Sequence, residues 1–279
     1  MDTRHEKLAH ARSFGEVADV YEAARPSYPA DAVSWLVRPD EVRVVDVGAG
    51  TGKLTRALVA AGHEVTAVDP SEQMLAVLRS RIPGVQTLTG TGEQLPLPDG
   101  TADAITFAQA WHWVDPQRAS VEAGRVLRPG GTLGLVWNLR DERVDWVREL
   151  GVAMRADKGQ YTIGMDDDPK VAAPFGTPER TEFGWTQPID REALLELVRS
   201  RSYFAVLDAA GQQKVLDAVR RLLDTHPQLA GREALELPYV TVAFRYRRPD
   251  RCAGATAARE GRRPVVRRPG PNPGCSESG

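Results

Sequence analysis

The 279-residue sequence is poor in cysteine and has no long hydrophobic run. Its two cysteines, Cys252 and Cys275, lie near the C-terminal end without a neighbouring histidine, so we expect no structural zinc site and no cysteine nucleophile in the body of the chain. Nowhere do about 18 apolar residues follow one another, which argues against a transmembrane helix. The first residues are polar and give no sign of a signal peptide, so a cytoplasmic protein is expected.

The net charge of −2 conceals two different segments. From residue 247 onward, eight arginines stand against three acidic residues, a net +5, which leaves −7 for the first 246 residues. Val265 and Val266 are the only large aliphatic residues of this segment, too little apolar surface to fold alone. We therefore expect one domain over 1–247 and a disordered basic tail over 248–279. A basic arm for nucleic acid or an acidic membrane is the alternative, although no aromatic residue is interleaved for base stacking.

Between residues 42 and 137, short apolar stretches alternate with helical ones. The pattern predicts strands over 42–47, 64–68, 85–89, 102–108 and 132–137. It predicts helices over 53–61, 71–81 and 116–127 between them, preceded by helices over 5–24 and 31–37. Strands that alternate with helices in this way are typical of βαβ units, which form a parallel sheet covered on both faces.

After residue 138 this alternation ends. The sequence predicts helices over 143–156, 191–199 and 209–223, a loop over 159–178, and strands over 180–187 and 239–246. In the last strand, the alternation places one set of side chains on a single face: Val240, Val242, Phe244 and Tyr246. The acidic run 166–168 has no companion ligands at metal-binding spacing, so no metal is predicted. We expect a helical lid insert within 139–235 and a closing pair of strands.

A glycine-rich turn, Gly48-Ala49-Gly50-Thr51-Gly52, follows the first strand and opens a helix. Glycines allow positive φ and close backbone approach, and the free N–H groups of a helix start suit an anionic or polar ligand. A P-loop is excluded because Leu54 stands where the Ser or Thr belongs, and a dinucleotide site is weakened because Lys53 replaces a small residue. Asp69, at the end of the second strand, can accept hydrogen bonds from both hydroxyls of a ribose.

Five segments in order carry a family resemblance: 44–52, 68–74, 90–97, 102–106 and 122–131. Together they resemble the class I S-adenosylmethionine-dependent methyltransferases, closely over 42–138 and more loosely over 13–247. The segments Phe14–Tyr21 and Arg25–Pro29, with Trp111-His112-Trp113, resemble the small-molecule branch, which includes trans-aconitate and ubiquinone/menaquinone-type enzymes. The resemblance implies an α/β fold with a Rossmann-like, mostly parallel seven-stranded sheet, helices on both faces and an antiparallel last strand, and S-adenosylmethionine as cofactor.

The resemblance also implies a set of cofactor-binding residues: Tyr21, Asp46, Gly48, Ala49, Gly50, Gly52, Asp69, Pro70, Met74, Thr91, Gly92, Glu93, Ala108, Gln109 and Trp111. The glycine turn would approach the methionine part, and Asp69 would bind the ribose. Thr91 stands where family members often have an acid, which puts a contact to the adenine amine in doubt. Three alternatives stay open: a structural role for Asp46, a helix-capping role for Asp69, and core packing for Trp111 or Trp113.

For the acceptor, the candidate residues are Arg25, Tyr28, Trp113 and Asn138. An arginine such as Arg25 would suit a carboxylate substrate through a bidentate bond. His112 is the candidate catalytic base. A structural or substrate-orienting role for His112 is the alternative, because the methyl donor is already activated.

The expected activity is methyl transfer from S-adenosylmethionine to a small molecule by in-line displacement. Two alternatives are a non-catalytic S-adenosylmethionine-binding protein on the same fold and an NAD(P)-dependent oxidoreductase. The charge of −7 over the first 246 residues argues against nucleic acid as the acceptor. No membrane partner is expected.

Overall fold

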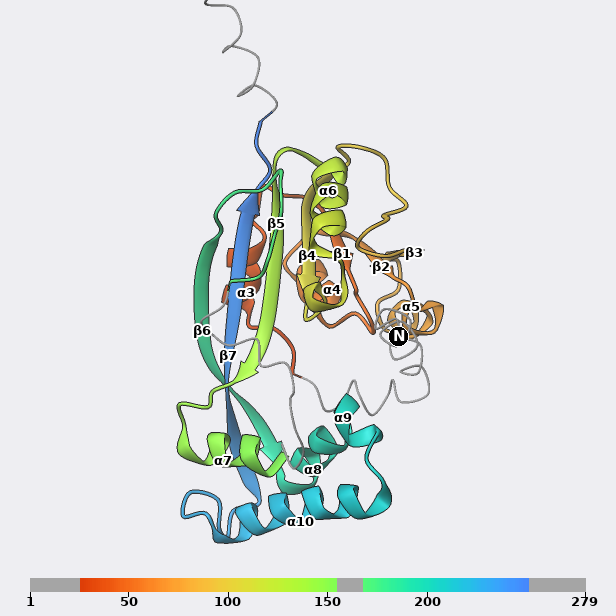
Figure 1. The fold of residues 1–279 in the computed structure, drawn as a ribbon. Helices are drawn as coiled ribbons and strands as arrows, with labels where there is room; N and C mark the ends of the chain where they lie inside the picture. The colour runs from red at the N-terminus through yellow and green to blue at the C-terminus, as the bar shows by residue number, and fades with distance from the viewer. Residues whose placement is uncertain (1–25, 155–167, 251–279) are drawn as a thin grey trace, which may run out of the picture. The chain divides into compact units, whose positions relative to one another are not determined.

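The computed structural model describes residues 26–154 and 168–250. The predicted helix over 5–24, residues 159–167 of the predicted loop over 159–178 and nearly all of the predicted tail lie outside these residues. The described elements, shown in Figure 1, are α3 (Ala30–Leu36), β1 (Arg43–Val47), α4 (Lys53–Ala60), β2 (Glu64–Asp69), α5 (Glu72–Arg81), β3 (Gln86–Thr89), β4 (Ala102–Ala108), η2 (Trp111–Trp113), α6 (Pro116–Val126), β5 (Leu127–Arg140), α7 (Asp145–Met154), β6 (Glu179–Asp190), α8 (Arg191–Arg199), α9 (Ser202–Ala205), α10 (Ala209–Thr225) and β7 (Ala234–Arg247).

The strands form a seven-stranded sheet in the order β3-β2-β1-β4-β5-β7-β6. Strands β1 to β5 run parallel to one another, and β7 runs antiparallel to both β5 and β6. The predicted α/β fold with an antiparallel last strand is therefore confirmed. The strand order reverses between β1 and β4, which in open α/β sheets is where ligands bind beyond the carboxyl ends of the strands.

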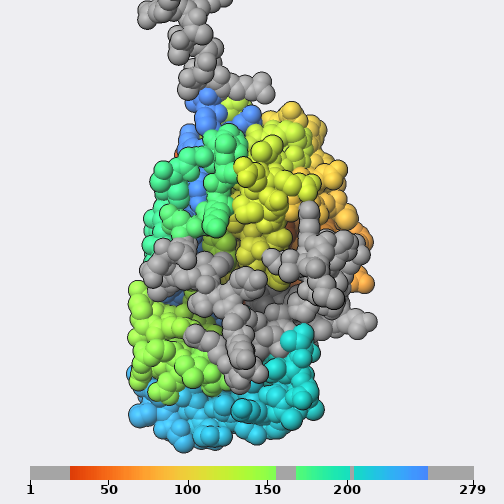
Figure 2. Space-filling model, in the orientation of Figure 1, coloured from red at the N-terminus to blue at the C-terminus, as the bar shows by residue number. Residues whose placement is uncertain are grey.

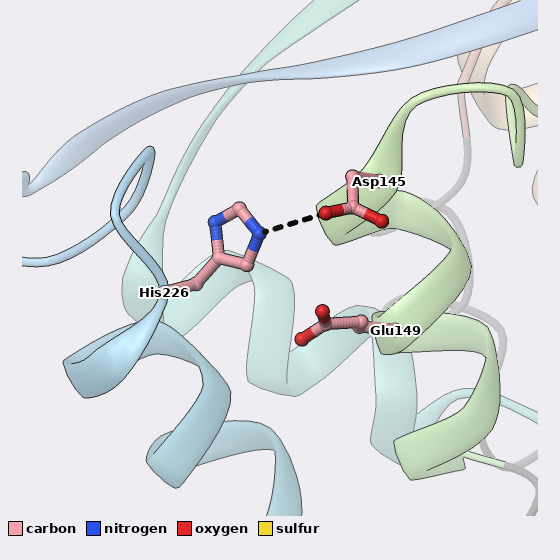
Figure 3. A group of neighbouring side chains, drawn as sticks. All are labelled: Asp145, Glu149 and His226. Atoms are coloured by element: carbon pink, nitrogen blue, oxygen red, sulfur yellow. Dashed lines mark ion pairs between the residues drawn. The ribbon is translucent and has the colours of Figure 1, made fainter.

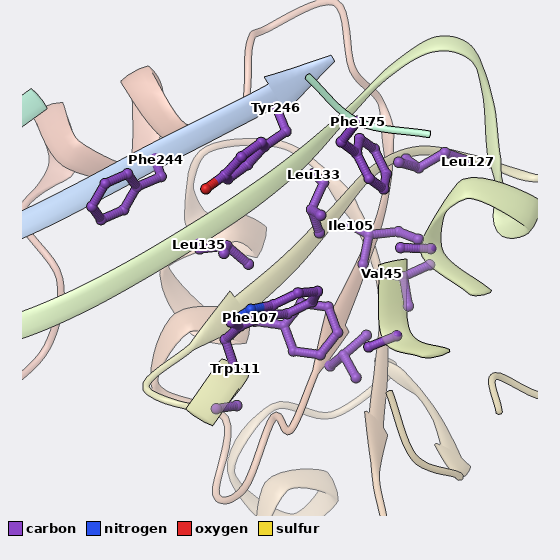
Figure 4. Close-up of a cluster of buried hydrophobic side chains, with 14 of the residues drawn as sticks. Val45, Ile105, Phe107, Trp111, Leu127, Leu133, Leu135, Phe175, Phe244 and Tyr246 are labelled. Atoms are coloured by element: carbon purple, nitrogen blue, oxygen red, sulfur yellow. The ribbon is translucent and has the colours of Figure 1, made fainter. Parts of the chain in front are cut away.

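The central strands are apolar because helices cover both faces of the sheet. Helices α3 and α4 pack on one face, where Leu36, Leu54 and Leu58 are buried. The other face carries the aromatic cluster of Figure 4, in which the rings of Phe107 and Trp111 meet edge to face with centroids 4.9 Å apart. Fully burying such a side chain stabilises the fold by roughly 1.5–3 kcal/mol.

Strands β5 and β7 are both longer than the sequence predicts. The predicted face of β7 is confirmed, since Val240, Val242, Phe244 and Tyr246 all join the aromatic cluster. The Pro-Gly-Gly stretch at 129–131 predicts a turn. In the structure, however, the Gly130 N–H donates to the Arg248 carbonyl, and the Arg248 N–H donates to the Gly131 carbonyl. Tertiary pairing thus overrides the local turn preference and extends β5 at its start.

A second core lies in the lid, where α7, α8 and α10 pack against the far ends of β6 and β7. Trp146, Leu150, Leu194, Val219 and Leu237 are all buried there. Helices α7 and α10 lie side by side in Figures 1 and 2 and contact each other. The predicted helices of the lid are present, but α9 is too short, at four residues, to leave a periodic signal.

The contacts between residues divide the chain into two compact units, Met1–Pro249 and Asp250–Gly279. Every helix and strand named above belongs to the first unit. Within the described part of the chain, no helix combines the length and apolar character needed to cross a membrane. The predicted disorder of the tail concerns residues outside the described ranges and stays a prediction.

Candidate active site

A cavity opens where the carboxyl ends of β1, β4 and β5 meet the start of β7. Its lining residues are Pro26, Tyr28, Gly48, Ala49, Gly50, Thr51, Lys53, Leu54, Ala108, Gln109, Asn138, Arg201 and Tyr239. They come from the segment before α3, the glycine turn, three strand ends and the lid. Seven of the predicted site residues are thereby brought together: Tyr28, Gly48, Ala49, Gly50, Ala108, Gln109 and Asn138.

The glycine turn has a left-handed backbone at Gly48, Gly50 and Gly52, with φ of 68°, 55° and 90°. A Cβ at Gly52 would lie 2.8 Å from Leu78 and 2.9 Å from Ile82, so core packing requires glycine at this position. Among the described residues, a Cβ at Gly50 would meet nothing within 4 Å, and Gly50 lines the cavity. The space beside Gly50 is therefore free for a ligand that approaches the backbone.

Asp46 is fully buried beneath this turn and does not line the cavity. The hydroxyls of Thr55 and Thr106 donate to its two carboxylate oxygens at 2.6 and 3.1 Å. Burial raises the pKa of Asp46 to about 6, although both hydroxyls lower it. These contacts, together with a backbone hydrogen bond from Thr55, are consistent with the structural alternative for Asp46. Its contact with the methionine ammonium stays a prediction.

Asp69 connects the end of β2 to the turn. Its Oδ2 accepts from the Gly50 N–H at 2.9 Å, and its Oδ1 accepts from the Ser71 N–H at 2.8 Å. Burial raises the pKa of Asp69, opposed by these two N–H groups. Ser71 itself caps α5 by accepting from the Met74 N–H, so the capping alternative for Asp69 falls away. Each carboxylate oxygen keeps a lone pair for a ribose hydroxyl.

The residues predicted for the adenine end form a tight loop after β3. Thr91 and Gln94 exchange two backbone hydrogen bonds. A Cβ at Gly92 would lie 2.8 Å from Val114, and the Glu93 carboxylate accepts from the Asp115 N–H at 2.9 Å. The Glu93 side chain thus holds the start of α6.

Thr91, Gly92 and Glu93 lie outside the lining of the described cavity, as do Gly52, Asp69, Pro70 and Met74. Their contacts to a cofactor remain predictions.

The Trp111-His112-Trp113 segment turns away from the cavity. The chain bends at Gln109, whose φ is 56°, and then forms η2. Trp111 is only 3% exposed, packs in the core and donates through Nε1 to the Lys170 carbonyl at 3.0 Å. It does not line the described cavity, and its contact with the cofactor stays a prediction. His112 and Trp113 are exposed, and neither lines the cavity.

Asn138 is part of a hydrogen-bonded chain that crosses the sheet. Its Nδ2 donates to the Ser27 carbonyl at 3.0 Å, and its Oδ1 accepts from the Thr241 hydroxyl at 2.6 Å. The Trp185 Nε1 donates to the same hydroxyl at 2.9 Å, and the Gln109 Nε2 donates to the Asn138 carbonyl at 3.0 Å. The chain fixes the segment before α3 over the cavity.

Six lining residues are absent from the set predicted from the sequence: Pro26, Thr51, Lys53, Leu54, Arg201 and Tyr239. Of these, Arg201 and Tyr239 come from the part of the chain after residue 138. Tyr239 could have been predicted, because the first residues of an antiparallel strand lie beside the last residues of its neighbour. In the structure, Tyr239 of β7 pairs with Arg140 at the end of β5. Arg201 could not have been predicted, since it lies between two lid helices with no motif around it. The predicted contacts of Tyr21 and Arg25 concern residues outside the described ranges.

One group in the lid has the composition of a metal site. Among the described residues, Asp145, Glu149 and His226 place one ligand atom each within 4.8 Å of one another (Figure 3). The His226 Nδ1 accepts from the Gln228 N–H at 3.2 Å, so in the neutral ring Nε2 carries the proton, and it lies 3.9 Å from Asp145. Asp145 also pairs with Arg148. Protein contacts thus account for this group, and the absence of a metal stays a prediction.

Comparison with known proteins identifies the family. The model of a family described as "Methyltransferase domain" matches residues 45–135. The chain is 51% identical to an "uncharacterized methyltransferase" of Mycobacterium bovis, covering 84% of this chain and 94% of that protein. A methyltransferase-like protein of Schizosaccharomyces pombe is 33% identical over 82% and 92% of the two chains. A solved structure named for a type II methyltransferase of Anaeromyxobacter dehalogenans superposes with a TM-score of 0.56 at 25% identity, covering 81% and 99%.

The sheet order, the antiparallel seventh strand and the glycine turn after β1 define a class I S-adenosylmethionine-dependent methyltransferase. With the identities above, the chain belongs to the methyltransferase family, and its cofactor is S-adenosylmethionine.

Proposed function

We propose that this protein transfers the methyl group of S-adenosylmethionine to a small-molecule acceptor in the cavity described above. The observation that carries the proposal is the open space beside Gly50 at the floor of that cavity. A backbone with positive φ and no Cβ leaves room for the methionine part of the donor, and the Asp69 carboxylate is available to the ribose.

The donor supplies an activated methyl group: the acceptor's lone pair forms the bond to the methyl carbon, the carbon–sulfur bond breaks, and its electron pair stays on sulfur as S-adenosylhomocysteine. The protein's part is to align the two partners and to exclude water. In this proposal the ends of β4 and β5, with Ala108, Gln109 and Asn138, surround the methyl group, and the lid closes the acceptor side. Among the described lining residues there is no histidine or carboxylate to serve as a base, so Gln109 and Asn138 act by orientation.

The roles predicted for the remaining residues belong to this proposal as well. Thr91 and Gly92 would border the adenine, Pro70 and Met74 would flank the ribose, and Tyr28 would contact the acceptor. The predicted base His112 receives no support from the cavity, because its side chain is exposed and lies outside the lining. We place the reaction in the cytoplasm, with neither nucleic acid nor a membrane as partner; the net charge of −7 over the first 246 residues supports the exclusion of nucleic acid.

The test is formation of S-adenosylhomocysteine from S-adenosylmethionine with a panel of small acids, amines, phenols and thiols. Acceptor-dependent product is expected, and replacing Gly50 by Ala should reduce its formation at subsaturating S-adenosylmethionine at least tenfold while the protein stays folded. Binding of S-adenosylmethionine without turnover on any acceptor would favour a non-catalytic binding protein. Binding of NAD(P) in its place would overturn the proposal.

A further inference from the structure

Arg201 brings a positive charge from the lid into the cavity. It follows α8 and precedes α9, and its backbone N–H donates to the Val198 carbonyl at 3.2 Å. Helix α8 is anchored in the lid core through Leu194, Leu197 and Val198, all nearly or fully buried. The base of the Arg201 side chain is therefore held in place, and the side chain lines the same cavity as Asn138 and Tyr239.

The guanidinium of Arg201 has no protein partner among the described residues. Its Nε is buried and makes no hydrogen bond. Other arginines of the lid are paired: Arg191 with Asp224, and Arg199 with both Glu192 and Glu196. A buried donor left without an acceptor is costly, and more so when charged, so a bound group that accepts from Arg201 would gain affinity.

The described lining of the cavity favours an anion beside Arg201, because it includes no Asp or Glu. Lys53 also lines the cavity but makes an interaction of its own, so Arg201 supplies the positive charge that an anion would balance. The nearest carboxylate below the turn, Asp46, is satisfied by two threonine hydroxyls and does not reach the cavity lining. Under the proposed function the glycine turn, with Lys53 at its end, takes the methionine part of the donor. Arg201 and Tyr239 then face the acceptor.

We propose that Arg201 binds a carboxylate of the acceptor and so selects acceptors that carry one. A guanidinium presents two parallel N–H groups that match the two oxygens of a carboxylate, and such charge-assisted bonds are the stronger ones in proteins. The single positive charge of Arg201 balances the single negative charge of a carboxylate. A phosphate monoester carries nearly twice that charge, so its complex with Arg201 would keep a net negative charge. This inference rests on the proposed methyl transfer, because the donor's position decides which ligand Arg201 faces.

The test compares Arg201→Gln and Arg201→Lys with the unchanged protein, and with Arg220→Gln on the exposed face of α10 as matched control. Straight-chain mono- and dicarboxylic acids of four to ten carbons are offered beside their primary amides and phosphate monoesters. We expect turnover of acids over amides and phosphate esters. Arg201→Gln should lower kcat/KM about 10- to 100-fold, mainly through KM, as expected for lost charged hydrogen bonds. The kcat/KM of Arg201→Lys should lie between those of the unchanged protein and Arg201→Gln. Lysine keeps the positive charge but lacks the two parallel N–H groups of a guanidinium.

Two binding measurements separate this inference from the proposed function. Affinity for S-adenosylhomocysteine should change less than threefold in Arg201→Gln; a large loss would assign Arg201 to the donor's carboxylate and overturn the inference. With S-adenosylhomocysteine saturating, the acids should raise Tm in the unchanged protein but not in Arg201→Gln. Acids that bind in this way without being methylated would count against the proposed methyl transfer, whereas the binding of carboxylates by Arg201 would be upheld. The inference would be refuted if acids and amides gave equal turnover and equal Tm shifts, or if phosphate esters were preferred. It would also be refuted if no acid raised the Tm of the unchanged protein.

Discussion

Asp46 and the glycines above it show how single residues divide the work of this site. Asp46 lies under the turn and supports it through Thr55 and Thr106 without reaching the cavity. Gly52 satisfies core packing against Leu78, whereas Gly50 leaves its open side to the cavity. One sequence motif therefore contains residues for folding and residues for binding, and substitutions should separate the two.

The buried Asp46 should make stability depend on pH. Its folded-state pKa of about 6 lies above the ordinary 3.8, so between about pH 4 and 6 the folded protein holds a proton that the unfolded chain has released. The free energy of unfolding should then fall as pH rises through this window, by up to about 3 kcal/mol, at ~1.4 kcal/mol per pKa unit. Asp46→Asn should lose this component, as measured by urea unfolding from pH 4 to 7.

The informative quantity is the difference in unfolding free energy between the unchanged protein and Asp46→Asn, because other carboxylates titrate in both. Asp217→Asn, on the exposed face of α10, serves as the control. A difference that stays constant over the whole pH range would show that the buried carboxylate does not titrate as described.

Gly50→Ala and Gly52→Ala should differ in what they damage. Both introduce a Cβ at positive φ, which costs roughly 1–2 kcal/mol. Gly52→Ala also forces a Cβ against Leu78 and Ile82, and overpacking of this kind adds roughly 1–3 kcal/mol. Urea unfolding should therefore rank Gly52→Ala as the less stable variant. Titration calorimetry should rank Gly50→Ala as the weaker binder of S-adenosylmethionine, by at least tenfold; unchanged affinity would contradict the placement of the methionine part beside Gly50.

At the scale of elements, one hydrogen-bonded chain ties three strands to the cavity. It runs from Trp185 on β6 through Thr241 on β7 to Asn138 on β5, and ends at the Ser27 carbonyl before α3. Asn138 lies one residue beyond the predicted end of β5, whereas Thr241 lies within the predicted part of β7. The chain thereby positions the segment before α3 relative to the lid helices.

Thr241→Val tests this chain, because it keeps the shape of a fully buried side chain and removes only the hydroxyl. The Trp185 N–H and the Asn138 Oδ1 would each lose a partner, so the free energy of unfolding should fall by about 1–3 kcal/mol. Hydrogen exchange should become faster at the backbone amides of Ser27 and Tyr28, the residues between Pro26 and Pro29. Thr186→Val, exposed on the edge strand β6, is the control; equal exchange in both variants would show that the chain does not hold this segment.

At the scale of the whole molecule, the sequence specifies the parallel half of the fold well and the lid side poorly. The strands at 42–47 and 102–108 are predicted within a residue of β1 and β4, because both faces are buried and the apolar run is continuous. The early start of β5 is missed, because its pairing partner near Arg248 is more than a hundred residues away. The site follows the same division: the turn at Gly48 and Gly50 is readable from local spacing, whereas Arg201 reaches the cavity only through tertiary packing of α8.

The central claim is that the glycine turn and the neighbouring Asp69 bind S-adenosylmethionine. The most direct measurement is calorimetric titration of S-adenosylmethionine into the unchanged protein, Asp69→Ala and the exposed control Asp217→Ala, with NAD as a second ligand. We expect one-to-one binding, no binding of NAD, and a loss of about 1–3 kcal/mol in Asp69→Ala alone, which is roughly 5- to 150-fold in Kd. Unchanged affinity in Asp69→Ala, or binding of NAD in place of S-adenosylmethionine, would contradict the account.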